Sequence, residues 1–202
     1  LVQDIVRDYL ANGPTQKELD DAKRELAGSK ALLFGYGAIG KLIKPRLEGF
    51  DVDVTVVRRS GGEGTLTPDQ WRDQLGEFDW VILAVPATDE TDGMIGAGEL
   101  AAMKDSAILV NVARGTVVDQ EALIAALKAK SIGSALLDVT TPEPLPADHP
   151  LWNLDNAHVT MHLSGRAQAS MFRRSAERFV KNLQSYVNGE PLHPVFDPVR
   201  GY

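Results

Sequence analysis

Three glycines, Gly35, Gly37 and Gly40, have the spacing G-x-G-x-x-G, with which a backbone loop can hold a pyrophosphate. The first glycine permits a tight turn, the second lets the backbone approach the phosphates, and the third lets a helix pack on a strand. A β-rich run precedes the loop and a helical pattern follows it, so free N–H groups would face the anion. A strand-to-helix turn without a ligand is the alternative. The intervening residues of the expected site are Tyr36, Ala38 and Ile39.

The next β-rich run ends in Arg58, Arg59 and Ser60. A site for NAD usually has Asp or Glu at this place, about 20 residues after the glycines, to bind the ribose 2′-hydroxyl. Two arginines and a hydroxyl can instead bind a 2′-phosphate through charge-assisted hydrogen bonds. The sequence therefore predicts NADP as the cofactor, with NAD as the alternative. Two solvated surface arginines would explain the same residues without a ligand.

The elements that must position these residues alternate along the chain. Strands are expected at 31–34, 52–57, 80–85, 107–112, 133–139 and 157–161. Helices are expected at 38–49, 68–75, 97–104, 119–129 and 166–188, with Pro45 kinking or shortening the first of them. This alternation predicts an α/β fold, a Rossmann-type doubly wound parallel sheet with flanking helices and the strand order 3-2-1-4-5-6.

The composition narrows the classes of function. The chain has 202 residues, a formal net charge of −7 and no cysteine. Without cysteine there is no disulfide and no thiol nucleophile, and we expect no metal site. The acidic balance argues against a nucleic-acid or anionic-membrane partner. No apolar run approaches the roughly 20 residues of a membrane span, and no leader opens the chain, so we expect a cytoplasmic protein.

The start of the sequence is unusual, because residue 1 is Leu and a helical lead-in of about 26 residues is already under way there. A strong turn signal, Asn12-Gly13-Pro14, interrupts this lead-in. We therefore expect that an N-terminal part precedes this chain in the natural protein. Removal of an initiator methionine is the alternative.

Further motifs follow the third predicted strand. They are Val85 to Thr91, Asn111 to Gly115, Leu137 to Pro146, Pro150 to Trp152 and Thr160 to His162. With the glycine loop, these motifs resemble the D-isomer-specific 2-hydroxyacid dehydrogenases, from about Leu26 to Tyr202. The resemblance implies that residues 1–202 form the dinucleotide-binding domain of a two-domain, homodimeric enzyme. Residues 1–28 would come from the interdomain region, and the 189–202 tail would return toward a substrate domain that this chain lacks.

The resemblance also implies three catalytic residues. Arg114 would bind the carboxylate and carbonyl of a 2-oxoacid, which suits a planar guanidinium. His162 would donate a proton to the carbonyl oxygen of the substrate. Glu143 would orient the imidazole ring and favour its protonated form. A structural arginine and a satisfied core histidine are the alternatives. The chain has Met161 where the family usually has proline. Methionine restricts the backbone next to His162 less than proline would.

On the cofactor side, the resemblance implies that Asp138 contacts the nicotinamide carboxamide. A helix-capping or turn aspartate is the alternative for this residue. Two other histidines are interpreted without a catalytic role, His158 as structural and His193 as a surface or interface residue. The remaining residues expected near the cofactor are Val85, Pro86, Thr88, Thr91, Val112 and Ala113.

Together these features predict an oxidoreductase that uses NADPH to reduce a small 2-oxoacid to a D-2-hydroxyacid. Glyoxylate and hydroxypyruvate are the expected substrates. The first alternative is a module that binds a dinucleotide without turnover, because the substrate domain is missing. A regulator that senses a dinucleotide is the second, and oxidation of formate or phosphonate is a third.

Overall fold

The computed structural model describes residues 15–165 and 171–195. Several expected features fall outside these described residues. They are the lead-in before residue 15, its turn near Asn12-Gly13-Pro14, the first part of the helix expected at 166–188, and the end of the 189–202 tail.

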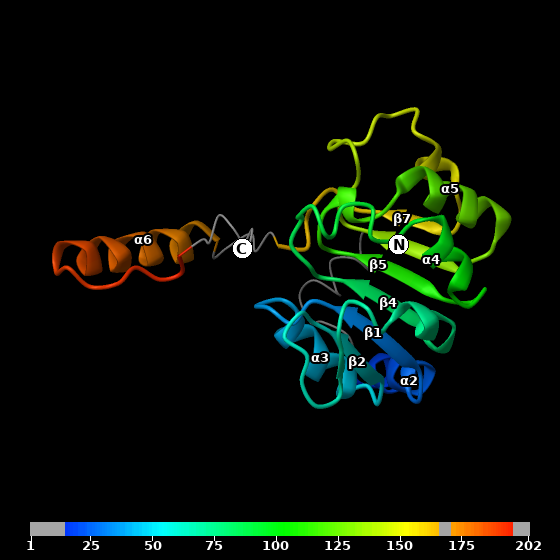
Figure 1. Cartoon of the computed structure of the whole chain (residues 1–202), viewed down its shortest axis with the longest axis horizontal. Coiled ribbons are helices and arrows are strands. Elements are labelled where there is room, and N and C mark those ends of the chain that lie inside the picture. Colours follow the sequence, from blue (N-terminus) through cyan, green and yellow to red (C-terminus); the bar gives the residue numbers. More distant parts are fainter. Residues whose placement is uncertain (1–14, 166–170, 196–202) are drawn as a thin grey trace.

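Within the described residues, a single sheet of seven parallel strands has the order β3-β2-β1-β4-β5-β6-β7 (Figure 1). The strands are β1 (Lys30–Phe34), β2 (Asp53–Val57), β3 (Thr65–Leu66), β4 (Trp80–Leu83), β5 (Ile108–Asn111), β6 (Ser134–Leu137) and β7 (Ala157–Val159). Every neighbouring pair is parallel. The predicted parallel α/β sheet is therefore confirmed.

The observed strand order contains 3-2-1-4-5-6 only in a numbering that includes β3 (Thr65–Leu66). The sequence did not predict β3. Over the six expected strands, the order 3-2-1-4-5-6 would place 80–85 at the edge of the sheet beside β2. That placement is wrong, because β4 pairs with β1 and Leu83 lies opposite Phe34. The edge position belongs to β3, where Leu66 lies opposite Val57. Two residues are too few to show a hydrophobic period, so no sequence pattern indicates this strand.

The helices largely follow the expected positions. They are α2 (Gln16–Leu26), α3 (Gly40–Glu48), α4 (Ala97–Ala102), α5 (Gln120–Ala129) and α6 (Met171–Val187). Pro45 lies inside α3, which continues past it to Glu48. The region 68–75, expected to be helical, forms instead a 3₁₀ helix at Arg72–Glu77. The Gln74 N–H donates to the Trp71 carbonyl oxygen three residues back, while the Gln74 side chain donates to the Gln70 carbonyl oxygen, which an α-helix would use, at 2.9 Å.

Two hydrophobic clusters lie on opposite faces of the sheet. On β1, Leu33 belongs to the smaller cluster, on which Ile43 of α3 packs. Leu32 and Phe34 point the other way into the larger cluster, which includes buried residues of α4 and α5. Helices therefore cover both faces, as a doubly wound sheet requires.

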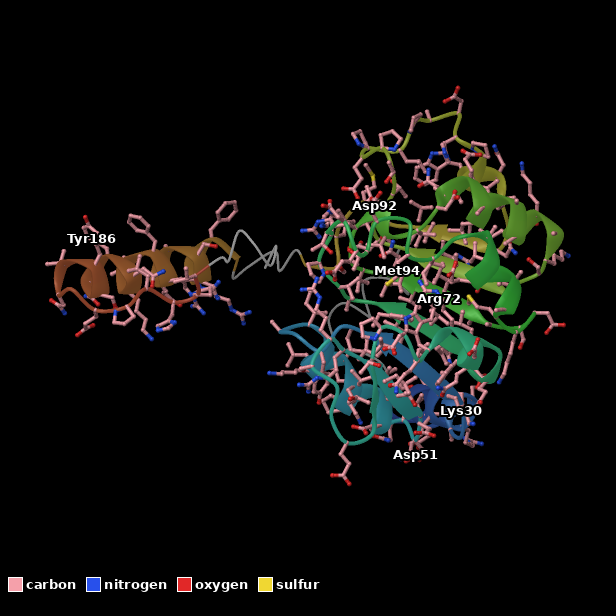
Figure 2. All side chains as sticks on the ribbon, in the orientation of Figure 1. Lys30, Asp51, Arg72, Asp92, Met94 and Tyr186 are labelled. Carbon is pink, nitrogen blue, oxygen red and sulfur yellow. The ribbon has the colours of Figure 1, made fainter. Side chains whose placement is uncertain are left out.

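Helix α6 lies outside the layers that cover the sheet (Figure 1). Its large apolar side chains are exposed, and Tyr186, labelled in Figure 2, is 74% accessible. The exposed apolar residues of this helix are Phe172, Phe179, Val180, Leu183, Tyr186 and Val187. Among the residues described here, none of the helices combines the length and apolarity that crossing a bilayer requires.

The parallel arrangement decides where a site can form. The carboxyl ends of β1, β2, β4, β5, β6 and β7 all meet one edge of the sheet. In open α/β sheets, ligands bind beyond this edge. The loops that leave these strand ends carry Arg114, Glu143 and His162, the three expected catalytic residues, and the first two glycines of the loop after β1.

Candidate functional site

The glycine loop begins directly after β1 and leads into α3. Gly35 has a φ of 93°, and a Cβ added there would lie 2.5 Å from the carbonyl oxygen of Ala84. A Cβ on Gly40 would lie 2.0 Å from the carbonyl oxygen of Gly35. A Cβ on Gly37 meets no described atom within 4 Å. The loop is therefore tightly packed at its first and third glycines and open at its second, as a pyrophosphate cradle requires.

The other loop residues divide between core and surface. Tyr36 is half-buried and packs against the smaller hydrophobic cluster, which anchors the start of the loop. Ala38 is exposed, and the Ile39 side chain is 53% accessible. The loop is therefore anchored at Tyr36 and exposed to solvent at Ala38 and Ile39.

At the end of β2, the two arginines have different partners. The guanidinium of Arg58 donates to Ser60 Oγ through Nε at 2.8 Å and through Nη2 at 2.5 Å. Arg59 Nη2 forms an ion pair with Glu90 Oε2 at 2.6 Å. The structure therefore brings Arg58 and Ser60 together, whereas Arg59 contacts an acid on another loop.

That second loop follows β4 and is held by its own threonines. Thr91 Oγ1 donates to the carbonyl oxygen of Pro86 at 2.7 Å and accepts from the Thr88 N–H at 2.9 Å. Val85 is half-buried and packs on the larger cluster. Pro86, Thr88 and Thr91 thus form one compact turn beside the glycine loop, and Glu90 lies within it.

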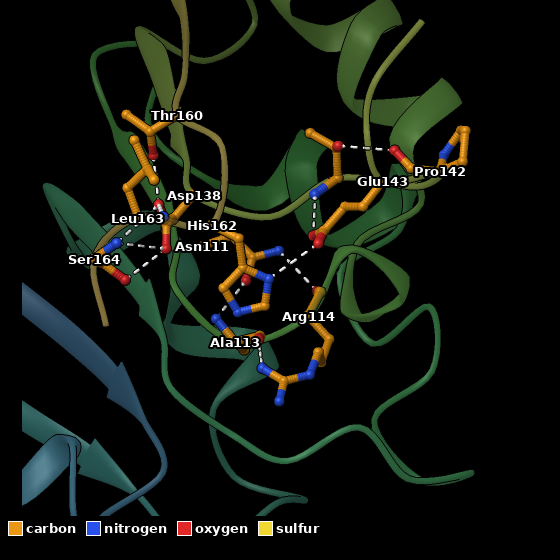
Figure 3. A network of polar contacts seen from close by, with 11 residues as sticks. Asn111, Ala113, Arg114, Asp138, Pro142, Glu143, Thr160, His162, Leu163 and Ser164 are labelled. Atoms are coloured by element: carbon orange, nitrogen blue, oxygen red, sulfur yellow. Dashed lines mark hydrogen bonds and ion pairs between the residues drawn. The ribbon is translucent and has the colours of Figure 1, made fainter. Parts of the chain in front are cut away.

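Asn111 shapes the turn that presents Arg114 (Figure 3). Its side chain is 1% accessible; Oδ1 accepts from the Ala113 N–H and Nδ2 donates to the Arg114 carbonyl oxygen, both at 3.0 Å. Val112 joins the turn to β4 by donating to the Leu83 carbonyl oxygen at 3.2 Å. The Arg114 side chain is exposed, and its Nη1 donates to the Ala113 carbonyl oxygen at 2.6 Å.

Gly115 lets this turn lie against the loop that follows β6. A Cβ at Gly115 would lie 2.1 Å from the carbonyl oxygen of Thr140 and 2.4 Å from Thr141 Oγ1. No side chain fits in that space. The contact between the two loops therefore depends on glycine, and it places the Arg114 turn beside the loop of Glu143.

Glu143 and His162 form a hydrogen-bonded pair (Figure 3). His162 Nδ1 lies 2.9 Å from Glu143 Oε2, and Glu143 Oε1 accepts from the Thr140 N–H at 3.1 Å. The hydrogen bond from His162 lowers the pKa of Glu143; burial opposes this, and the Thr140 N–H and the charges of His162 and Arg114 lower it further. Glu143 is therefore a carboxylate at neutral pH, and it can accept a hydrogen bond from His162 Nδ1.

The turn that carries His162 is held by Asp138. His162 has a φ of 54°, which is unusual for a residue with a side chain, and its N–H donates to the Asp138 carbonyl oxygen at 2.7 Å. The Asp138 carboxylate is buried and accepts from Thr160 Oγ1, the Leu163 N–H and Ser164 Oγ at 2.5, 2.8 and 2.5 Å.

These contacts match the alternative interpretation of Asp138 as a turn aspartate. Its contact with a nicotinamide carboxamide stays a prediction. The same contacts show what fixes the backbone where the family usually has proline. Met161 is 62% accessible, so its side chain adds little packing, and the Asp138 carboxylate holds the turn instead.

Asp138 has a consequence for stability in acid. Burial raises its pKa, but the hydrogen bonds from Ser164, Thr160 and Leu163 outweigh burial and lower it from 3.8 to about 2. A lowered pKa in the folded state stabilises the protein above the unfolded pKa. This contribution, about 2 kcal/mol, is lost as the pH falls from about 4 toward 2.

Asp138→Asn is therefore expected to lower the free energy of unfolding by about 2 kcal/mol at pH 7, with a difference that shrinks below about pH 4. Urea unfolding between pH 7 and 2.5 measures this difference. Asp155→Asn, at an exposed aspartate, is the matched control. A destabilisation that is the same at every pH would contradict the assignment of the effect to the carboxylate charge.

The two histidines interpreted without a catalytic role, His158 and His193, lie elsewhere. His158 is exposed on the edge strand β7. His193 is also exposed, and its N–H donates to Asn182 Oδ1 at 3.3 Å. Within 15–165 and 171–195, no group of three or more His, Asp or Glu side chains is arranged to hold a metal ion.

Two positioning residues were missed in the sequence. One is Asn111, whose side chain shapes the Arg114 turn. The other is Gln120, the first residue of α5, which pairs with the backbone of Thr141: Oε1 accepts from the N–H at 3.0 Å and Nε2 donates to the carbonyl oxygen at 2.6 Å. Both act through backbone contacts that a single sequence does not indicate. The motif that contains Asn111 was the nearest available signal.

Comparison with known proteins gives consistent results. Residues 4–164 match the family model described as D-isomer specific 2-hydroxyacid dehydrogenase, NAD binding domain. The chain is 41% identical to a glyoxylate reductase of Pyrococcus furiosus over 171 residues, which cover 82% of this chain and 50% of that protein. It is 37% identical to a glycerate dehydrogenase of Methylorubrum extorquens over 173 residues, which cover 85% and 54%.

A solved structure agrees in fold. It is a D-isomer specific 2-hydroxyacid dehydrogenase from Xanthobacter autotrophicus in complex with NADPH and MES, with a TM-score of 0.80 and 33% identity over 98% of this chain and 87% of that chain. This chain spans about half the length of the curated relatives named above. The matched residues include the glycine loop, the Arg114 turn, Asp138, Glu143 and His162. The chain therefore belongs to the D-isomer-specific 2-hydroxyacid dehydrogenase family and carries its NAD-binding domain.

Proposed function

We propose that this chain is the dinucleotide-binding half of an NADPH-dependent reductase, which converts a small 2-oxoacid to a D-2-hydroxyacid. Glyoxylate and hydroxypyruvate are the substrates we favour. The glyoxylate reductase and glycerate dehydrogenase among the relatives support this substrate class.

The observation that carries the proposal is the pair of His162 and Glu143 beside the Arg114 turn. His162 Nδ1 is 2.9 Å from Glu143 Oε2. A carboxylate at this distance accepts a hydrogen bond from Nδ1 and fixes the orientation of the ring. The other ring nitrogen then carries a proton for a reacting oxygen. A purely structural histidine would need neither the charged partner nor partial exposure.

The residues divide the chemistry as follows. When bound, the cofactor supplies a hydride to the carbonyl carbon of the substrate. The exposed guanidinium of Arg114 binds the substrate carboxylate through two hydrogen bonds and so fixes which face of the carbonyl is presented. His162 donates its proton to the carbonyl oxygen as negative charge develops there, and Glu143 stabilises the charged imidazole until then. In the reverse direction, His162 accepts the proton of the hydroxyl group.

The loop geometry also supports a nicotinamide dinucleotide as the cofactor. The open space at Gly37 leaves backbone available to the phosphates, and the N-terminus of α3 adds positive polarity. Arg58 and Ser60 already lie within hydrogen-bonding distance of each other at the end of β2. We propose that they bind the 2′-phosphate that distinguishes NADPH from NADH.

We further propose that residues 1–202 act with a substrate domain. The exposed apolar side chains of α6 support this, because a partner domain would cover them, and the 189–202 tail would then return toward that domain. The homodimer and the cytoplasmic location expected from the sequence stay predictions.

Titration calorimetry of the 202-residue chain with NADPH and NADH tests the cofactor. We expect NADPH to bind about 10- to 100-fold more tightly, since a hydrogen bond to a charged group contributes about 1.5–3 kcal/mol. Equal affinities would remove the NADP preference and leave the family unchanged. Turnover of glyoxylate and hydroxypyruvate, assayed with the substrate domain joined, tests the reaction. Tight NADPH binding without turnover of any 2-oxoacid would favour a dinucleotide-sensing module instead.

A further inference from the structure

A carboxylate reaches the end of β2 although β2 itself ends without one. Glu90 belongs to the loop after β4, and its Oε2 lies 2.6 Å from Arg59 Nη2. The Arg59 side chain is 45% accessible and the Glu90 side chain is 71% accessible. The ion pair is therefore exposed to solvent at the rim of the expected cofactor site. The neighbouring Arg58 donates a hydrogen bond to Ser60 Oγ at 2.8 Å.

The loop of Glu90 is held firmly enough to keep this carboxylate in place. Thr91 Oγ1 donates to the Pro86 carbonyl oxygen at 2.7 Å and accepts from the Thr88 N–H at 2.9 Å. The Asp92 N–H donates to the Thr88 carbonyl oxygen at 3.0 Å. Glu90 therefore leaves a compact turn, and only its side chain has to move to leave Arg59.

The two forms of the cofactor differ at the group this carboxylate would meet. A ribose 2′-hydroxyl can donate a hydrogen bond to a carboxylate, the interaction that Asp or Glu provides in NAD sites. A 2′-phosphate is an anion, which a carboxylate repels and which arginines attract. Glu90 also cancels part of the positive charge of Arg59. The Glu90 carboxylate should thus raise the affinity for NADH and lower the affinity for NADPH.

We propose that Glu90 is a specificity-determining residue that narrows the preference of this chain for NADPH, so that NADH remains a usable cofactor. This inference rests on the proposed function, in which Arg58 and Ser60 bind the 2′-phosphate. Because an exposed ion pair is weak, the 2′-phosphate can displace Glu90 from Arg59. The carboxylate therefore reduces the affinity for NADPH without abolishing it.

The test is calorimetry of NADPH and NADH binding to the wild-type chain, Glu90→Gln and Asp89→Asn at about 0.15 M ionic strength. Asp89→Asn is the matched control, because it removes one negative charge from the neighbouring position in the same loop. We expect Glu90→Gln to tighten NADPH binding about threefold to fivefold and to weaken NADH binding, so that the ratio of the two affinities rises. We expect Asp89→Asn to leave the ratio within about twofold, because general charge effects are screened. Thermal melting confirms that each variant is folded.

The outcomes separate this inference from the proposed function. A wild-type preference for NADPH with a ratio unchanged in Glu90→Gln, or changed equally in Asp89→Asn, overturns the role of Glu90 and leaves the proposed cofactor standing. Equal wild-type affinities with an NADPH preference that emerges in Glu90→Gln contradict the proposed preference but support Glu90. Failure of the wild-type chain to bind either nucleotide overturns both.

Discussion

Replacing His162 by alanine is expected to lower kcat for 2-oxoacid reduction by about 10²- to 10⁴-fold, the usual contribution of a positioned proton donor. The affinity for NADPH should change by less than about twofold, because binding depends on other loops at the same edge of the sheet. Steady-state kinetics with the substrate domain joined, together with calorimetry of the cofactor, separate the two effects.

His158→Ala is the matched control for this prediction. It removes the same side chain four residues earlier, at an exposed position on β7. We expect its kcat to stay near that of the wild type. Turnover that survives in His162→Ala would remove the proposed proton donor, and an equal loss in His158→Ala would point to general damage at the edge of the sheet.

Gly37→Ala is expected to weaken binding of either dinucleotide at least tenfold and to leave thermal stability nearly unchanged. An added Cβ meets no described atom of the chain within 4 Å, so the folded protein accommodates it. The same methyl group would occupy the space through which the backbone approaches the pyrophosphate. Calorimetry and thermal melting of one preparation measure both quantities.

Gly40→Ala provides the opposite case in the same loop. Its Cβ would lie 2.0 Å from the Gly35 carbonyl oxygen, so either the loop or α3 must shift. We expect this variant to lose stability as well as binding. If Gly37→Ala bound NADPH like the wild type, the loop would be a structural turn and the cofactor would have to bind elsewhere.

The sequence predicted those features that rest on local patterns. The glycine spacing indicated which loop follows β1, and the apolar runs of β4 and β5 indicated a parallel sheet buried on both faces. The three glycines differ in the structure in the way their spacing predicted, with Gly35 and Gly40 in tight contacts and Gly37 open. The family resemblance implied that Glu143 pairs with His162, and the structure places the two side chains 2.9 Å apart.

What the sequence did not predict depends on partners distant along the chain. The donors that surround Asp138 come from residues 22 to 26 positions later, so its engagement could not be inferred from its own neighbours. Glu90 contacts Arg59 across 31 positions, so the residues at the end of β2 gave no sign of this acid. Strand β3 is too short for any period to appear.

The strand order separates two tasks in space. The contacts of Arg58 lie at the end of β2, whereas Glu143 follows β6, and β1, β4 and β5 lie between them. Four strand spacings amount to about 19 Å, beyond the range at which substitutions usually couple. Changes in cofactor choice and in substrate chemistry should therefore combine additively. Under the proposed function, the end of β2 can thus be altered to accept a different dinucleotide while the Glu143–His162 pair stays unchanged.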